Sequence, residues 1–141
     1  MSHTLGTEIR LNDPFVTAVE RVRSALKSEG FGVLTEVDLR ATFKEKLGAD
    51  FRPFIMLGAC NPPLALRALT AAPEVGLLLP CNVTIESDDA GGSVVRIVDP
   101  RILLAAARLA EIPQLREIAD DAGARLARVA TDLRRKVQHA A

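Results

Sequence analysis

Two cysteines are the residues of this chain whose chemistry is easiest to name. Cys60 and Cys81 are the only cysteines among 141 residues; an apolar run precedes each, and asparagine follows each, as Asn61 and Asn82. A strand that buries its apolar residues delivers the polar residues at its end to the rim of a sheet. Two such strands predict one pocket that holds both thiols and both amides. We take this pocket as the candidate functional site.

The position of Cys60 favours a reactive thiol, whereas the residues before it favour a buried one. Cys60 comes directly before Asn61, the expected cap of a helix that begins at Pro62, and the positive end of a helix favours the thiolate, the reactive form of cysteine. Cys60 would then be a nucleophile, a redox thiol or a metal ligand with Cys81 as its partner. The simpler interpretation makes both cysteines small core residues, because free cysteine is among the most buried residue types and apolar surroundings make a thiol inert.

A metal site within one chain has too few candidate ligands. Structural zinc takes four ligands, whereas the chain offers the two thiols of Cys60 and Cys81, with His3 and His139 near its ends. We therefore expect no metal in a single chain, and no cofactor can be named. A dimer would double the number of thiols, so a metal or a haem at a dimer interface, with Met56 as a further ligand, is a third hypothesis. Triads that need an internal histidine are excluded.

Two charged residues extend the candidate pocket. Glu36 and Asp38 are two positions apart at the end of a predicted strand, so they share a face and resemble a pair of acid and base carboxylates. Lys46, with Lys44 and Arg52 nearby in sequence, suggests an anion site. The simpler interpretation is that Asp38 caps a helix and that Glu36 and Lys46 lie on solvated faces.

Composition excludes several classes of function. Eighteen basic residues balance eighteen acidic ones, and the chain has five phenylalanines but no tryptophan or tyrosine. It therefore offers neither the net charge nor the stacking surface that nucleic-acid binding uses, and no net attraction to an anionic membrane. The apolar runs are too short to span a bilayer, and the first residues lack the pattern of a secretory signal. We expect a cytoplasmic protein with free thiols.

Proline and glycine residues mark the ends of the predicted elements and divide the chain into five strands and five helices. Asp13-Pro14, Asn61-Pro62 and Asp99-Pro100 each predict a helix start, because the Asx side chain caps free amides and proline suits the first turn. The helices are expected from Pro14 to Lys27, from Asp38 to Gly48, from Pro62 to about Ala71, from Pro100, and from Pro113 to about Gln138. The strands are expected at Thr7 to Leu11, Phe31 to Val37, Phe54 to Ala59, Leu77 to Glu86 and Ser93 to Val98.

This order predicts an α+β two-layer fold with a mixed or mostly antiparallel five-stranded sheet and helices mainly on one face. The β-α-β opening allows some parallel pairing. Residues 1–141 are expected to form a single domain, with residues 110–141 packing on that domain or on a twin subunit. If only one face of the sheet is covered, the other must be polar or buried by association, so we expect a homodimer.

Four ordered blocks of the chain resemble a known family. They are Gly30-Phe31-Gly32-Val33-Leu34-Thr35-Glu36-Val37-Asp38, Lys44-Glu45-Lys46-Leu47-Gly48, Leu57-Gly58-Ala59-Cys60-Asn61-Pro62 and Gly76-Leu77-Leu78-Leu79-Pro80-Cys81-Asn82-Val83, and they are similar to the domain-of-unknown-function family 302. The resemblance implies a small α+β protein that dimerises, and it implies no activity. Whether the chain is an enzyme stays open. The leading hypothesis is a homodimeric ligand-binding or structural protein, and the alternatives are a thiol redox protein or sensor and a metal or haem site.

Overall fold

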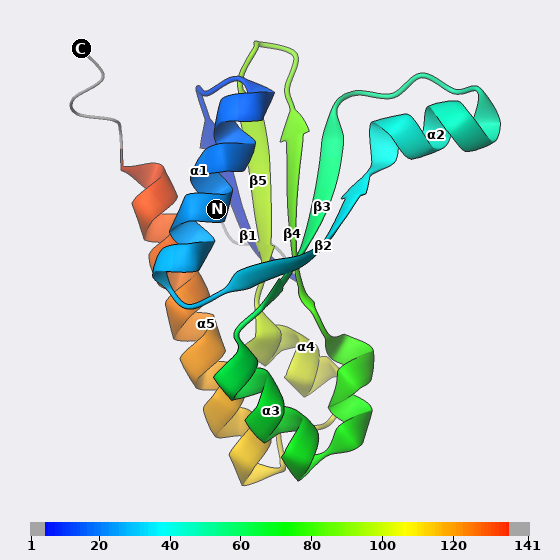
Figure 1. Ribbon diagram of the computed structural model, residues 1–141. Coiled ribbons are helices and arrows are strands. Elements are labelled where there is room, and N and C mark those ends of the chain that lie inside the picture. Colours follow the sequence, from blue (N-terminus) through cyan, green and yellow to red (C-terminus); the bar gives the residue numbers. More distant parts are fainter. Residues whose placement is uncertain (1–4, 136–141) are drawn as a thin grey trace.

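The computed structural model describes residues 5–135, which form one antiparallel sheet with helices packed on it and below it (Figure 1). The strands are β1 (Gly6–Leu11), β2 (Gly32–Asp38), β3 (Phe54–Cys60), β4 (Cys81–Ser87) and β5 (Ser93–Val98). The helices are α1 (Phe15–Ser28), α2 (Leu39–Leu47), α3 (Pro62–Ala71), the 3-10 helix η1 (Pro73–Leu78), α4 (Pro100–Ala106) and α5 (Pro113–Arg134).

The strand order is β1-β5-β4-β3-β2, and every pair is antiparallel. The α+β fold and the antiparallel form of the predicted sheet are therefore confirmed. The parallel pairing that the β-α-β opening allowed does not occur in residues 5–135, because α1 carries the chain from one edge of the sheet, β1, to the opposite edge, β2.

The core lies between the sheet and two helices. Alternating residues of the strands, among them Leu57, Val83 and Val95, face α1 and the second half of α5, which contribute Val22 and Val129. These five side chains are fully buried. A second apolar cluster joins α3, η1, α4 and the first half of α5 beyond the end of the sheet (Figure 1). The molecule thus has a sheet-and-helix body with a small helical lobe below it.

Most of the predicted helix caps are confirmed. Asn61 Oδ1 accepts from the Leu64 amide at 3.3 Å, Asp99 Oδ1 accepts from Arg101 at 2.9 Å, and Asp38 Oδ1 accepts from Ala41 at 2.9 Å. The cap predicted at Asp13 was wrong. Helix α1 begins at Phe15 with Pro14 as its N-cap, so Asp13 lies one residue before the cap position, and its carboxylate accepts from Arg21 Nη1 at 2.7 Å.

The fourth strand begins later than predicted. Residues 77–80 do not extend β4: Gly76 to Leu78 belong to η1, and β4 begins at Cys81. An apolar run of this length fits a buried helical turn as well as a strand, and Pro80 has no N–H to give to a ladder. The last helix ends at Arg134, and the predicted extension to Gln138 lies outside the described residues.

Candidate functional site

The antiparallel sheet brings the C-terminal end of β3 and the N-terminal end of β4 to the same end of the sheet. In the β3–β4 ladder Ala59 lies opposite Cys81, and Gly58 lies opposite Asn82. The Cys81-Asn82 pair therefore stands at the beginning of a strand and not at its end, as the sequence pattern suggested. The two Cys-Asn pairs become neighbours because consecutive antiparallel strands run in opposite directions.

An apolar cavity of about 80 Å³ opens at this end of the sheet, between the sheet and the helical lobe. Residues of β3, α3, η1, β4, α4 and α5 line it, together with Phe31. All the lining residues are apolar except Cys60, Asn61 and Cys81. A water molecule needs about 10–15 Å³ of such space, so the cavity has room for a guest of several heavy atoms.

Small side chains on two helices leave this space open. Ala65 and Ala68 face the cavity from α3, and Ala119 and Ala122 face it from α5. Their spacings of three residues place each pair on one helical face. Alanine brings only a methyl group to a packing surface, whereas leucine at such a position fills the gap between helices. These paired alanines are a second signal in the sequence that could have indicated the cavity, and the prediction from the cysteines did not include them.

The two thiols on the cavity wall differ in environment. Cys81 is buried, and its pKa is raised from the ordinary value of 9.0 to about 11, first by burial and then by the nearby charge of Cys60. Its thiol is therefore protonated and unreactive at neutral pH. Cys60 is only partly buried and directly precedes Asn61, the N-cap of α3.

The structure does not show the cysteine pair that redox cycling requires. Both cysteines are free, and the register pairs Cys81 with Ala59 and not with Cys60. Both thiols line the cavity, but no disulfide joins them, and Cys60 is one residue out of register with Cys81.

Asn61 is a structural residue of the cavity wall. It is 8% exposed, and its side-chain oxygen is used in capping α3. Its amide lies against Gly30, whose φ of +85° belongs to the left-handed region; a Cβ built on Gly30 would lie 2.9 Å from Asn61 Nδ2. Asn61 thus fixes the approach of α3 to the end of α1.

The other three candidate residues do not line the cavity. Asn82 is exposed on the sheet. Glu36, on the edge strand β2, forms an ion pair with Arg23. Lys46 is exposed on α2, which is attached to the opposite end of β3 (Figure 1). Lys46 is therefore remote from the Cys-Asn pairs, because β3 has its N-terminal end at α2 and its C-terminal end at the cavity. Glu36 lies opposite Leu57, in the middle of β3, and its carboxylate is used by Arg23 of α1.

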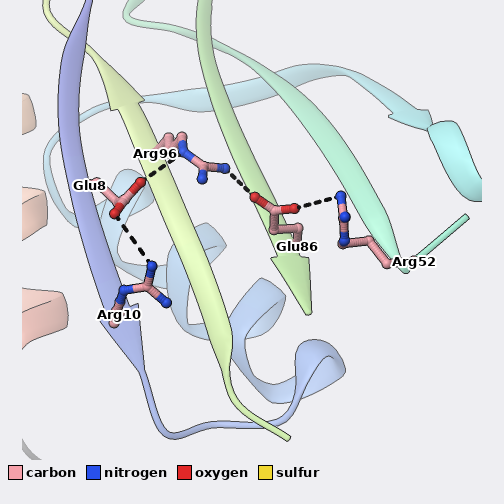
Figure 2. Close-up of polar contacts among 5 residues, drawn as sticks. All are labelled: Glu8, Arg10, Arg52, Glu86 and Arg96. Carbon is pink, nitrogen blue, oxygen red and sulfur yellow. Dashed lines mark hydrogen bonds and ion pairs between the residues drawn. The ribbon is translucent and has the colours of Figure 1, made fainter. Parts of the chain in front are cut away.

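The sheet face that α1 and α5 leave open carries a row of charges (Figure 2). Arg96 donates to Glu8 at 3.0 Å and closely contacts Glu86, and Arg52 Nη1 lies 3.2 Å from Glu86 Oε2. The hydrogen bond to Glu86 is the main cause that raises the pKa of Arg96. Arg10 also lies 3.8 Å from Glu8, so three arginines alternate with two glutamates along the row, and most of their charge is neutralised within it.

Metal ligands are not gathered in the described part of the chain. Among residues 5–135 no group of three or more His, Cys, Asp and Glu side chains is placed to hold a metal ion. His3 and His139 lie outside these residues. Over the same range, no helix has both the length and the apolar character needed to cross a membrane.

Comparison with known proteins agrees with the fold. A family model described as "Domain of unknown function DUF302" matches residues 7–133. The structure is similar to the crystal structure of an uncharacterized conserved DUF302 protein from Bacillus stearothermophilus, with a TM-score of 0.82 and 30% sequence identity over 94% of this chain and 100% of that one. No curated protein matches the sequence.

Proposed function

The chain belongs to the DUF302 family, whose description gives no activity, and we propose that it is a binding protein for a small apolar ligand that occupies the cavity at the end of β3. The observation that carries this proposal is the cavity itself. It is about 80 Å³ in volume and almost wholly apolar in its lining. Ligand sites are typically concave, mostly apolar and equipped with a few polar groups, and this cavity has those features.

The lining defines the class of ligand. No charged side chain lies on the wall, so an ionised group would enter without a partner and at a high desolvation cost. The Asn61 oxygen is already used by the α3 amide, so the polar groups that remain on the wall are the two thiols and the side-chain nitrogen of Asn61. A compact uncharged apolar molecule, such as a single ring or a short branched chain, fits these conditions.

Benzene is a suitable first probe. The wild-type protein should bind it with a measurable rise in thermal stability, because a ligand that binds only the folded state stabilises it by mass action. Ala68→Leu and Ala119→Leu, which each add bulk to the wall, should abolish that rise. Ala71→Leu is the matched control, since Ala71 lies on α3 like Ala68 but is exposed.

Several outcomes would contradict this proposal. Wild-type protein without any response to benzene would make the cavity a packing feature and the domain a structural one. An equal response of wild type and both filled variants would place benzene elsewhere. Nuclear magnetic resonance spectra of the variants establish that they are folded, and two filling positions keep the test informative if one variant is unstable.

The other hypotheses have less support. Thiol redox cycling lacks a formed cysteine pair, and a metal or haem site lacks a ligand cluster within residues 5–135. Met56 does not line the cavity. The expected homodimer stays a prediction.

A further inference from the structure

The side-chain amide of Asn61, on the wall of the cavity, has different surroundings at its two ends. The residue is 8% exposed and lines the cavity. Its oxygen accepts from the Leu64 amide at 3.3 Å in the cap of α3. Its nitrogen, Nδ2, donates to no group in the part of the chain that the structure describes. One end of this buried amide is therefore paired, and the other is not.

The helix cap fixes which end of the amide is which. A side-chain amide can be turned end for end where both orientations find suitable partners. The turned amide of Asn61 would place an N–H donor against the N–H of Leu64, and two donors cannot pair. The oxygen therefore stays on α3, and Nδ2 stays on the side of Gly30, where a Cβ would lie 2.9 Å from it. The position of the unpaired donor is thus set by the fold.

The surroundings of Nδ2 leave it open to the cavity. The other polar group beside Gly30 is Arg125 Nη1, which is also a donor and donates to the Glu29 carbonyl at 3.2 Å. Within residues 5–135, every side-chain nitrogen or oxygen that is fully enclosed has a hydrogen-bond partner. Because Nδ2 has none, it keeps contact with open space, and the open space that Asn61 borders is the cavity.

An unpaired donor on an apolar wall favours a ligand that brings an acceptor. A buried polar group without a partner is destabilising, and a ligand that pairs with it recovers that free energy on binding. A site of this kind also discriminates against a ligand of the same shape that lacks the acceptor. Nδ2 should therefore decide which of several apolar molecules of similar size binds best.

The rest of the wall selects the kind of acceptor. A carboxylate would enter without a cationic side chain to pair with it. A hydroxyl would bring a proton of its own, for which the side chains of the wall, apart from the capping oxygen of Asn61, offer only the sulfur atoms of Cys60 and Cys81. Thiol sulfur is a weak acceptor. A carbonyl oxygen has lone pairs and no proton, so it fits the wall better than either group.

From these observations we propose that the ligand of the cavity is a small uncharged carbonyl compound, such as a ketone, whose oxygen accepts a hydrogen bond from Asn61 Nδ2. Its carbon skeleton packs on the alanines of α3 and α5. This inference rests on the proposed function, because it names the class of the ligand that occupies the cavity. Asn61 then has two roles, since its oxygen caps α3 and its nitrogen positions the ligand.

Two probes of the same shape isolate the hydrogen bond. Cyclopentanone and methylenecyclopentane share one carbon skeleton and differ in that a carbonyl oxygen replaces a CH₂ group. Asn61→Asp keeps an oxygen for the cap and removes the N–H donor, and Asn61→Ser does so without adding a charge. In both variants the dissociation constant of the ketone, divided by that of the alkene, should rise roughly tenfold above its wild-type value.

An exposed asparagine supplies the matched control. Asn82→Asp makes the same chemical change on β4, outside the cavity, and should leave the ratio of the two dissociation constants at its wild-type value. Asn61→Ser keeps the test available if the buried carboxylate of Asn61→Asp destabilises the fold. Titrations followed by nuclear magnetic resonance give both dissociation constants and show that each variant is folded.

The same spectra give a direct readout of the hydrogen bond. The side-chain amide signals that are missing from Asn61→Asp are those of Asn61, and cyclopentanone should shift them further than methylenecyclopentane does. A ratio unchanged in both Asn61 variants, or an equal shift by the two probes, would overturn the carbonyl ligand and leave the cavity as a binding site. Wild-type protein that binds neither probe would overturn this inference together with the proposed function.

Discussion

Ala59 and Cys81 face each other across the β3–β4 ladder, and this relationship places a buried thiol on the wall of the apolar cavity. Cys60 is the next residue along β3 and is only partly buried. The two cysteines thus reach one cavity from neighbouring strands in different environments, and their reactivities should differ accordingly.

The thiols should react at different rates. At pH 7.5 a thiol reagent such as dithionitrobenzoate should label Cys60 in the native protein, whereas Cys81 should react only after unfolding, because a buried protonated thiol is a poor nucleophile. Mass spectrometry of the labelled peptides identifies the residue, and Cys60→Ala should lack the native reaction. Rapid labelling of Cys81, or a loss of two daltons on mild oxidation, would contradict this assignment.

The raised pKa of Cys81 predicts a loss of stability at alkaline pH. Its pKa is about 11 in the folded protein and near 9.0 in an ordinary setting, so between these values the folded state holds a proton that the unfolded state releases. Stability should therefore be full below pH 9 and should fall as pH rises toward 11, by roughly 2–3 kcal/mol. Urea unfolding at pH 7 and pH 10.5 measures this fall.

The variants that isolate this effect are single alanine substitutions. Cys81→Ala should show a smaller difference between the two pH values than wild type, because the titrating group is gone. Cys60→Ala should retain most of the difference, since burial is the larger cause of the shift. An equal pH dependence in Cys81→Ala and wild type would show that the thiol titrates normally.

Three glycines form a graded series that tests the contact between Gly30 and Asn61. Gly30→Ala should lower the free energy of unfolding more than Gly48→Ala. Both glycines have positive φ, but only a Cβ at Gly30 would lie 2.9 Å from Asn61 Nδ2. The left-handed conformation alone costs about 1–2 kcal/mol for a residue with a Cβ. Gly32→Ala should be nearly neutral, since open space surrounds it. Chemical denaturation of the three variants gives the order, and equal losses for Gly30 and Gly48 would exclude the contact with Asn61.

The charged row on the open sheet face should depend on its central carboxylate. Glu86 is buried and touches both Arg96 and Arg52, so Glu86→Ala should cost about 1–2 kcal/mol. Arg10→Ala should cost at most about 0.5 kcal/mol, because Arg10 is exposed and lies 3.8 Å from Glu8. High salt should narrow the difference in free energy of unfolding between the two variants, because it screens the ion pairs; unfolding curves in low and high salt measure this. Equal losses in free energy of unfolding for the two variants would mean that the burial of Glu86 does not strengthen its ion pairs.

Local spacing was enough to predict most of the elements. The helix that follows Asn61-Pro62 and the one that follows Asp38 begin where a capping side chain precedes a suitable first turn, and both caps form. Such signals act over three or four residues, so they are contained in the sequence itself. The run from Gly76 to Leu79 lacked a signal of this kind, because a short apolar segment fits a strand and a helical turn equally.

The candidate site depends on contacts between residues that lie far apart in the chain, which local spacing does not predict. The pattern of Cys60-Asn61 and Cys81-Asn82 located three of the cavity residues by analogy between strand ends, but the second pair stands at a strand start, and Asn82 is exposed. The sequence by itself determined the caps, most of the helices and strands, and the class of fold, because these follow from interactions between near neighbours. Only the tertiary structure decided that β1 and β2 occupy opposite edges and that alanines of α3 and α5 leave a cavity between them, because strand pairing and helix packing join residues far apart in the chain.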